Sequence, residues 1–185
     1  MRIISGEARG RKLFAPAGED TRPTADRIRE SVFNILSARV WDAEVLDLFG
    51  GTGAMALEAL SRGAEHAVIV DSGREAIRAI ERNSRSVLKD AAPERVKILR
   101  ADYRAAIDAM RDVRFDLVFL DPPYRMADAY ADALTRLRAR GLLGEDCICL
   151  LERAADAQIS LPDGFERYDT RTYGGTSVEF VREAR

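Results

Sequence analysis

The chain has 185 residues, of which 46% are hydrophobic and 32% are charged, and its formal net charge is −2. This is the composition of an ordinary globular protein with one core, so we expect a single domain over residues 1–185. No stretch approaches the roughly 20 apolar residues of a membrane span, and the first residues lack a signal-peptide pattern. We therefore expect a cytoplasmic protein.

The first predicted element is a small β-hairpin, formed by residues 2–5 and 11–14 within an N-terminal extension over residues 1–22. Pro23 then opens a leading helix, residues 23–40, whose apolar side chains recur at helical spacing. The net acidic charge argues against a nucleic-acid partner, but Arg and Lys outnumber Asp and Glu as far as residue 29. A local basic surface is thus compatible with nucleic-acid binding.

Short apolar runs typical of buried strands then alternate with amphipathic stretches through the catalytic core, residues 44–185. The runs are 45–49, 67–70, 96–99 and 115–120, and the helical stretches are 54–62, 74–88 and 127–140. This alternation predicts an α/β fold with a doubly wound, mostly parallel sheet. Residues 165–172 and 176–182 flank the turn Tyr173–Gly175, which predicts an antiparallel C-terminal hairpin at the sheet edge.

The two cysteines, Cys147 and Cys149, alternate within an apolar run and are expected to be buried, reduced thiols on one face of a strand. His66 is the only histidine, so no companion histidine ligands are present for a metal. We therefore expect no metal site.

A glycine-rich loop, Asp47–Gly53, joins the first core strand to the next helix. Small residues there let backbone approach a ligand, and helix N–H groups face an anionic group. Gly51, Gly53 and Ala56 fit a G-x-G-x-x-A pattern, and Asp71 ends the next strand 20 positions after Gly51. The loop fits both a nicotinamide dinucleotide and S-adenosylmethionine, whereas a P-loop is excluded by the absence of Gly-Lys-Ser/Thr.

Each of these features also has a structural interpretation. The glycines would serve equally well in a tight turn without a ligand. Asp71 could cap the helix that follows it rather than hold ribose hydroxyls. Asp102, after the third strand, could likewise cap a helix or accept a hydrogen bond from an adenine amino group.

The fourth strand ends in Asp121-Pro122-Pro123-Tyr124, at the edge where open α/β sheets bind ligands. The prolines fix the backbone and remove N–H donors, so Asp121 and the Pro122 carbonyl can present two acceptors to an NH2 group. Tyr124 offers a flat face on which an extruded base can stack. The alternative interpretation is a strand-ending turn with a tyrosine in the core.

These features together resemble class I S-adenosylmethionine-dependent methyltransferases of the amino-group type. They are most similar to the bacterial small-subunit ribosomal RNA guanine-N2 methyltransferases, the RsmD family. The matching segments are residues 2–6, 9–13, 21–30, 46–53, 57–64, 121–124 and 173–176. The Arg22-Pro23-Thr24 and C-terminal elements select this family, because the Asp-Pro-Pro-Tyr motif is shared with adenine-N6 and glutamine-amide methyltransferases.

The resemblance implies a Rossmann-like, seven-stranded sheet of order 3-2-1-4-5-7-6 and S-adenosylmethionine as the methyl donor. It also implies methylation at N2 of a guanine in 16S rRNA, presented on an assembled or assembling 30S subunit. We expect the protein to be a monomer. The implied catalytic residues are Asp121, Pro122, Pro123 and Tyr124. The implied cofactor-binding residues are Asp47, Phe49, Gly51, Gly53, Asp71 and Asp102. The implied RNA-binding residues are Arg9, Arg11, Lys12, Arg22 and Arg27.

Two residues depart from the family pattern. Gly50 stands where alanine is usual, which we expect only to loosen the loop, and Asp71 stands where glutamate is common. The basic residues could also form an ordinary solvated face, and Arg22 and Arg27 could order the active-site loop. A methyltransferase acting on adenine N6 or a glutamine amide, and a non-catalytic RNA-binding assembly factor, remain as alternatives.

Overall fold

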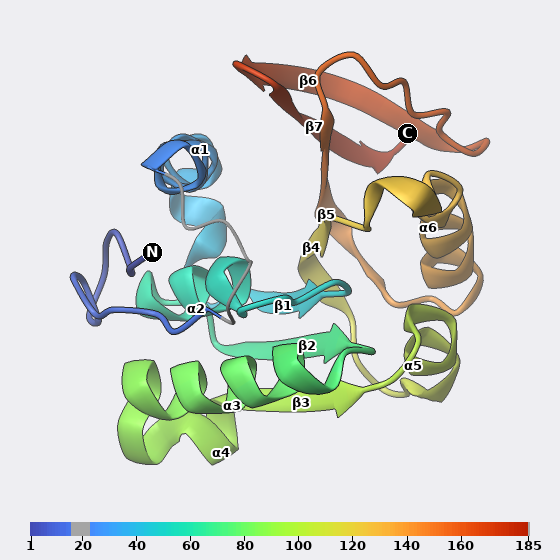
Figure 1. Cartoon of the computed structure of the whole chain (residues 1–185). Coiled ribbons are helices and arrows are strands. Elements are labelled where there is room, and N and C mark those ends of the chain that lie inside the picture. The colour runs from blue at the N-terminus through green and yellow to red at the C-terminus, as the bar shows by residue number, and fades with distance from the viewer. Residues whose placement is uncertain (16–22, 185) are drawn as a thin grey trace.

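The computed structural model describes residues 1–15 and 23–184. Its strands are β1 Glu44–Asp47, β2 His66–Asp71, β3 Val96–Arg100, β4 Phe115–Leu120, β5 Leu143–Ala154, β6 Phe165–Tyr173 and β7 Thr176–Glu183. They form one sheet in the order β3-β2-β1-β4-β5-β7-β6, with β1 to β5 parallel and β7 antiparallel to both β5 and β6 (Figure 1). The α/β fold, the strand order and the antiparallel C-terminal hairpin are those predicted.

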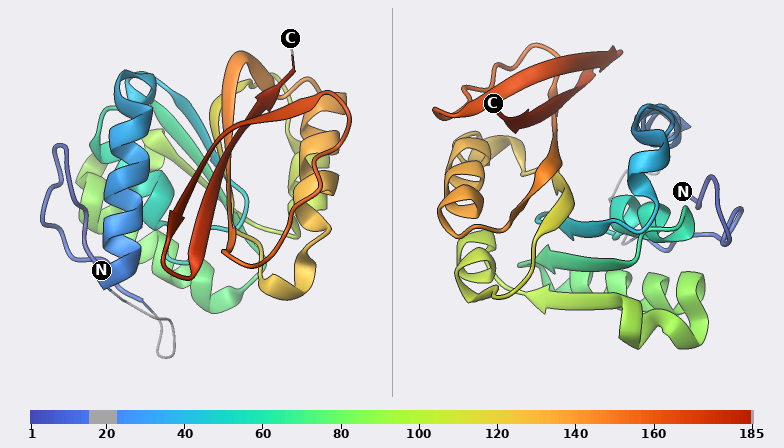
Figure 2. Two further views of the ribbon diagram at one scale, coloured as in Figure 1. Left: turned by 90° about the horizontal axis from the view of Figure 1, so that it is seen from above. Right: turned by 180° about the vertical axis from the view of Figure 1, so that it is seen from behind.

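Helices cover both faces of this sheet. The α-helices are α1 Pro23–Leu36, α2 Ala54–Ser61, α3 Arg74–Leu88, α4 Ala92–Arg95, α5 Tyr103–Ala109 and α6 Ala129–Ala139, and the 3-10 helices are η1 Ser37–Val40, η2 Lys89–Ala91 and η3 Tyr124–Met126. Helices α1, α2 and α3 lie on one face and α5 and α6 on the other (Figures 1 and 2). The sheet has a hydrophobic core on each face. Phe33, Leu57 and Ile80 belong to the core on the side of α1, α2 and α3, and Ile107 and Leu134 belong to the core on the side of α5 and α6.

The carboxyl ends of β1, β2 and β4 meet at one edge of the sheet because these strands are parallel neighbours. The glycine loop, Asp71 and the turn after β4 therefore converge there. Strand β5 continues beyond the parallel part and pairs with β7, so the β6–β7 hairpin stands above the sheet beside α1 (Figures 1 and 2). The Ser31 hydroxyl of α1 lies 2.5 Å from the Tyr173 hydroxyl at the end of β6.

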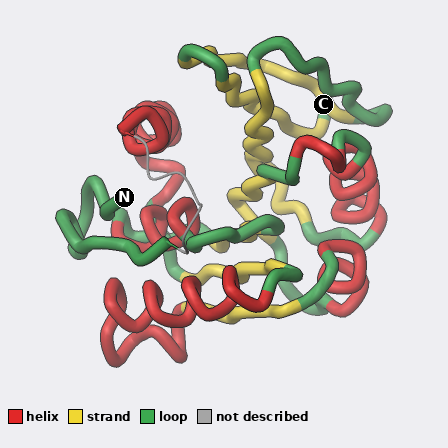
Figure 3. The backbone as a smooth tube through the Cα atoms, in the orientation of Figure 1, coloured by secondary structure: helices red, strands yellow, loops and turns green. Residues whose placement is uncertain are grey.

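The predicted N-terminal hairpin pairs antiparallel as expected, but through the single bridge Arg2–Lys12 rather than through two regular strands. Figure 3 accordingly draws this segment as a loop. The amides of Ile4 and Ser5 donate to the carboxylate of Glu58 on α2, so they are not available to a partner strand. Gly6 approaches the end of α2 so closely that an added Cβ would lie 1.7 Å from the Ser61 carbonyl oxygen.

The leading helix is shorter than predicted, because α1 ends at Leu36 and continues only as the 3-10 helix η1. Arg22 lies outside the described residues. Cys147 and Cys149 are buried free thiols, as predicted. Within the described part of the chain, none of the helices is both long enough and apolar enough to span a lipid bilayer.

Candidate active site

A cavity of about 610 Å³ opens at the carboxyl edge of the parallel strands. Its walls come from the loop after β1, the end of β2, the segment after β3, the turn after β4, and residues of α1, β5 and β7. The predicted residues that line it are Asp47, Phe49, Gly51, Asp71, Asp102, Asp121, Pro122, Pro123 and Tyr124. Gly53 is not among the lining residues and lies at the N-cap of α2 instead.

The glycine loop turns sharply from β1 into α2. Gly51 and Gly53 have φ values of +54° and +77°, which side-chain-bearing residues rarely adopt. The Gly53 amide donates to the Gly50 carbonyl at 2.6 Å, which closes the turn. No atom lies within 4 Å of where a Gly51 Cβ would stand, so the backbone at Gly51 has open space beside it.

Gly50 has a stricter role than the expected loosening of the loop. A Cβ at this position would lie 2.4 Å from Cγ2 of Ile69 on β2 and 3.1 Å from Cδ1 of Ile80 on α3. Because Ile69 is β-branched and fully buried, its methyl group has little freedom to move away. In this chain, glycine at position 50 therefore allows the loop to pack closely against β2.

Asp102 caps the helix that follows it, whereas Asp71 does not, because α3 has Gly73 as its N-cap and no side-chain cap hydrogen bond. The two Asp71 carboxylate oxygens accept hydrogen bonds from the Gly51 amide at 2.9 Å and the Gly73 amide at 2.7 Å. Asp102 is the N-cap of α5 and accepts from the Arg104 amide at 2.9 Å. Both residues also line the cavity.

Asp47 is buried behind the glycine loop. Its pKa is raised to about 7, mainly by burial and also by the nearby charges of Asp121 and Asp71, although hydrogen bonds from the Phe49 and Ala56 amides act to lower it. Phe49 packs its ring against Tyr103, with ring centroids 5.3 Å apart. The Asp47 carboxylate thus accepts hydrogen bonds from the backbone amides of Phe49 and Ala56, and the Phe49 side chain forms part of the cavity wall.

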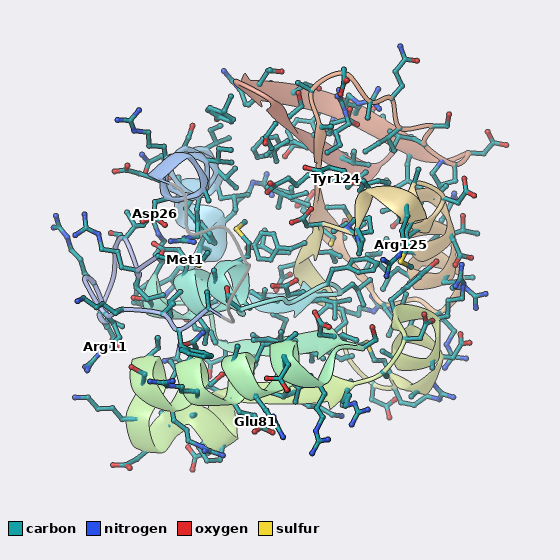
Figure 4. The ribbon with its side chains drawn as sticks, in the orientation of Figure 1. Met1, Arg11, Asp26, Glu81, Tyr124 and Arg125 are labelled. Carbon is teal, nitrogen blue, oxygen red and sulfur yellow. The ribbon has the colours of Figure 1, made fainter. Side chains whose placement is uncertain are left out.

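In the turn after β4, Tyr124 points into solvent, whereas the carboxyl group of Asp121 is largely surrounded by protein. Tyr124 is 83% exposed, so the interpretation of this tyrosine as a core residue is wrong (Figure 4). The Pro123 carbonyl accepts from the Met126 amide at 2.7 Å, whereas no described residue donates to the Pro122 carbonyl. Asp121 keeps solvent contact through the cavity mouth, but surrounding protein and then the charge of Glu152 raise the pKa of its carboxyl group.

Sequence reasoning missed Glu152, which lines the cavity from the carboxyl end of β5. A signal was present, because Glu152 follows the apolar run Cys147–Leu151 just as Asp121 follows Phe115–Leu120. A carboxylate directly after a buried strand was considered for other strands of the sheet but not for this one.

A second missed residue, Glu58, is fully buried under the N-terminal segment, residues 1–15. Its carboxylate pairs with Arg62 at 2.7 Å and with Arg29 at 3.5 Å, in addition to the amides of Ile4 and Ser5. Arg29 also lines the cavity. This buried network connects the N-terminal segment, α1 and α2.

The basic residues lie on the surface. Arg9, Arg11 and Lys12 are exposed in the N-terminal segment, with Arg11 at its outer edge in Figure 4, and Arg27 is exposed on α1. None of these four forms an ion pair with an acidic residue of the described chain. This arrangement fits both a solvated face and a surface that contacts RNA.

The sheet order and the cavity beside the glycine loop define a class I methyltransferase fold. Residues 1–182 match the family described as "Conserved hypothetical protein 95". The chain belongs to this family, the RsmD family of methyltransferases.

Among its relatives, Ribosomal RNA small subunit methyltransferase D of Escherichia coli is 33% identical over 100% of this chain and 91% of that protein. YlbH of Bacillus subtilis is 36% identical over 99% of both chains. The solved structure of YhhF from Escherichia coli is 27% identical, with a TM-score of 0.85 over 99% of this chain and 97% of that one.

Proposed function

We propose that the protein transfers a methyl group from S-adenosylmethionine to the exocyclic N2 of a guanine in small-subunit rRNA. The observation that carries the proposal is that the glycine loop and the Asp121–Tyr124 turn open on the same cavity. A site for a methyl donor and a site for an amino group are thus adjacent. The name of the Escherichia coli relative supports small-subunit rRNA as the substrate.

The cavity residues fit the proposed cofactor. A volume of about 610 Å³ is in the range of small-molecule and cofactor sites. The open space at Gly51 admits a ligand against bare backbone, Asp71 would hold ribose hydroxyls, and Asp102 would accept from the adenine amino group. When bound, S-adenosylmethionine supplies an electrophilic methyl group on its sulfonium sulfur.

The residues of the turn position the acceptor amine. An exocyclic amine is a weak nucleophile because its lone pair is delocalised into the ring. Asp121 and the Pro122 carbonyl would hold the two N2 hydrogens so that the lone pair faces the methyl group, and Tyr124 would stack on the base. The carboxylate of Asp121 would accept the N2 proton that methylation releases and pass it to solvent at the cavity mouth, consistent with its raised pKa.

We assign RNA contact to the exposed basic residues Arg9, Arg11, Lys12 and Arg27, with the substrate presented on an assembled or assembling 30S subunit. Each Lys or Arg that contacts a phosphate adds to the salt dependence of binding. A variant with alanine at Arg9, Arg11 and Lys12 should bind small subunits more weakly, with a salt slope reduced by about one per lost contact. An unchanged slope would support the solvated-face interpretation.

The proposal is tested in a strain that lacks the protein. Nucleoside analysis of its small-subunit rRNA should reveal the loss of N2-methylguanosine, restored by the wild type and by the exposed control Asp156→Ala but not by Asp121→Ala. Loss of N6-methyladenosine, or an rRNA without any change, would refute the guanine assignment. Full restoration by Asp121→Ala would refute the proposed mechanism.

A further inference from the structure

The register of the sheet places Asp121 and Glu152 side by side. Leu120 of β4 pairs with Leu151 of β5, and each leucine is followed directly by one of the two carboxylates. Successive side chains of a strand alternate between faces, and neighbouring strands lie about 4.8 Å apart. Asp121 and Glu152 therefore share the face of Phe119 and Leu150, which line the cavity.

Glu152 is held firmly in this position. Its backbone pairs with Val178 of β7, whose side chain also lines the cavity, and its carbonyl accepts a hydrogen bond from the Tyr130 hydroxyl at 2.5 Å. Burial raises the pKa of the Glu152 carboxyl group, and its charge raises the pKa of Asp121. The carboxyl groups of Asp121 and Glu152 are thus close enough to interact electrostatically within the same wall of the cavity.

Asp121 and Glu152, which are partly accessible, differ from the fully buried glutamates elsewhere in the molecule. Glu58 pairs with Arg29 and Arg62, and Glu179 pairs with Arg153 and Arg167. In contrast, no described residue donates a hydrogen bond or forms an ion pair with the side chain of Asp121 or Glu152. Both side chains remain partly accessible at the cavity, so their acceptor oxygens are free to take donors from a ligand.

Among the four common RNA bases, guanine has the edge that matches two neighbouring acceptors. Guanine carries a ring N1–H directly beside its exocyclic N2 amino group, so two donors point the same way. In adenine and cytosine, the ring nitrogen beside the amino group is an acceptor and would face the negative Glu152 carboxylate. Uracil has no exocyclic amino group.

We propose that Glu152 is a specificity-determining residue that accepts the N1–H of the target guanine, while Asp121 holds the adjacent N2 amino group. This inference rests on the proposed function and adds a structural basis for guanine selection. Adenine is disfavoured because its N1 lone pair would face a carboxylate and leave it without a donor, and sites built on such a hydrogen bond strongly reject analogues that lack it.

The test compares two acceptors that share the 2-amino group. Small subunits are reconstituted with rRNA whose mapped target nucleotide is either guanosine or 2-aminopurine riboside, which has an unprotonated N1. The wild type should prefer guanine, and the kcat/KM ratio for the two substrates should fall about tenfold or more in Glu152→Gln. Because 2-aminopurine also lacks O6, the change in ratio between enzymes, rather than the ratio itself, measures the contact of Glu152 with N1–H.

Two further variants make the result decisive. Glu152→Asp keeps the charge and should retain more of the preference than Glu152→Gln, whereas Glu145→Gln, an exposed change at the other end of β5, should leave it unchanged. An unchanged ratio in both Glu152 variants would overturn the inference while leaving guanine methylation intact. A wild type that methylates no guanine would overturn the proposed function and the inference together.

Discussion

The two walls of the cavity satisfy their acidic groups in different ways. In the cofactor wall, residues 47–53 with Asp71 and Asp102, each aspartate accepts hydrogen bonds from backbone amides. In the acceptor wall, residues 121–124 with Glu152, neither carboxyl group has a donor among the described residues. The cofactor wall is therefore complete before any ligand arrives, whereas we expect the substrate to complete the acceptor wall.

The largest expected effects are on kcat for a substitution in the acceptor wall and on cofactor affinity for a substitution in the cofactor wall. Asp121→Asn should lower kcat by about 10²- to 10³-fold, because an amide presents one acceptor fewer and takes up no proton. Its affinity for S-adenosylmethionine, measured by calorimetry, should stay close to that of the wild type. Asp71→Asn should do the opposite, weakening cofactor affinity by about tenfold or more with a smaller change in kcat. Equal effects of both variants on both quantities would contradict the division.

The second prediction concerns stability and pH. The folded state raises the pKa of Asp47 from 3.8 to about 7, so between these values it binds a proton that the unfolded chain does not. The free energy of unfolding should therefore fall as pH rises from about 4 to about 7, by on the order of a few kcal/mol. Urea titrations at several pH values should give a shallower dependence in Asp47→Asn, and an unaltered one in the control Asp156→Asn.

The third prediction tests the packing of the glycine loop. Gly50→Ala should lower the free energy of unfolding by about 1–3 kcal/mol, because its methyl group would overlap the Ile69 side chain. Ile69→Ala removes the obstructing methyl, so the double variant should be more stable than the sum of the single changes predicts. Strict additivity in denaturant titrations would argue against this contact as the reason for glycine.

The smallest predicted effect is a shift in a pH profile. Activity should decline below about pH 7 as Asp121 becomes protonated and can no longer accept the N2 proton. Glu152→Gln removes the charge that contributes to this raised pKa, so the acidic limb of kcat/KM should move to lower pH. The limb should not return to an ordinary aspartate value, because burial is the larger cause. A limb that stays in place would show that Glu152 does not act on Asp121.

Much of this arrangement could be predicted from local sequence. The alternation of apolar runs and helical stretches predicts the parallel sheet, and the positions at or just after the ends of buried strands indicate Asp71, Asp102 and Asp121. The strand order came from family resemblance rather than from periodicity. Local patterns suffice where the carboxyl ends of parallel strands meet, because their meeting follows from the fold class alone.

The rest depends on contacts between segments far apart in the chain. Glu152 meets Asp121 only through the pairing of Leu120 with Leu151, a register that neither strand encodes alone. The sequence predicts more regular strand pairing in the N-terminal hairpin than the structure has. The reason is that the amides of Ile4 and Ser5 donate hydrogen bonds to Glu58, which lies 53 or more residues away. A glutamate on a helix gives no sign in the sequence that it will be fully buried.

Glu58 also has a consequence for how an RNA would be received. Helix α2 begins at the glycine loop, and its Glu58 and Ser61 hold the N-terminal segment through the amides of Ile4, Ser5, Glu7 and Ala8. Arg9, Arg11 and Lys12 are thus held by the same helix that begins at the cofactor loop, so their contact with RNA requires little loss of chain entropy. If RNA binding displaced α2, the affinity for the cofactor would change as well, and by reciprocity a bound cofactor would change the affinity for RNA by the same factor.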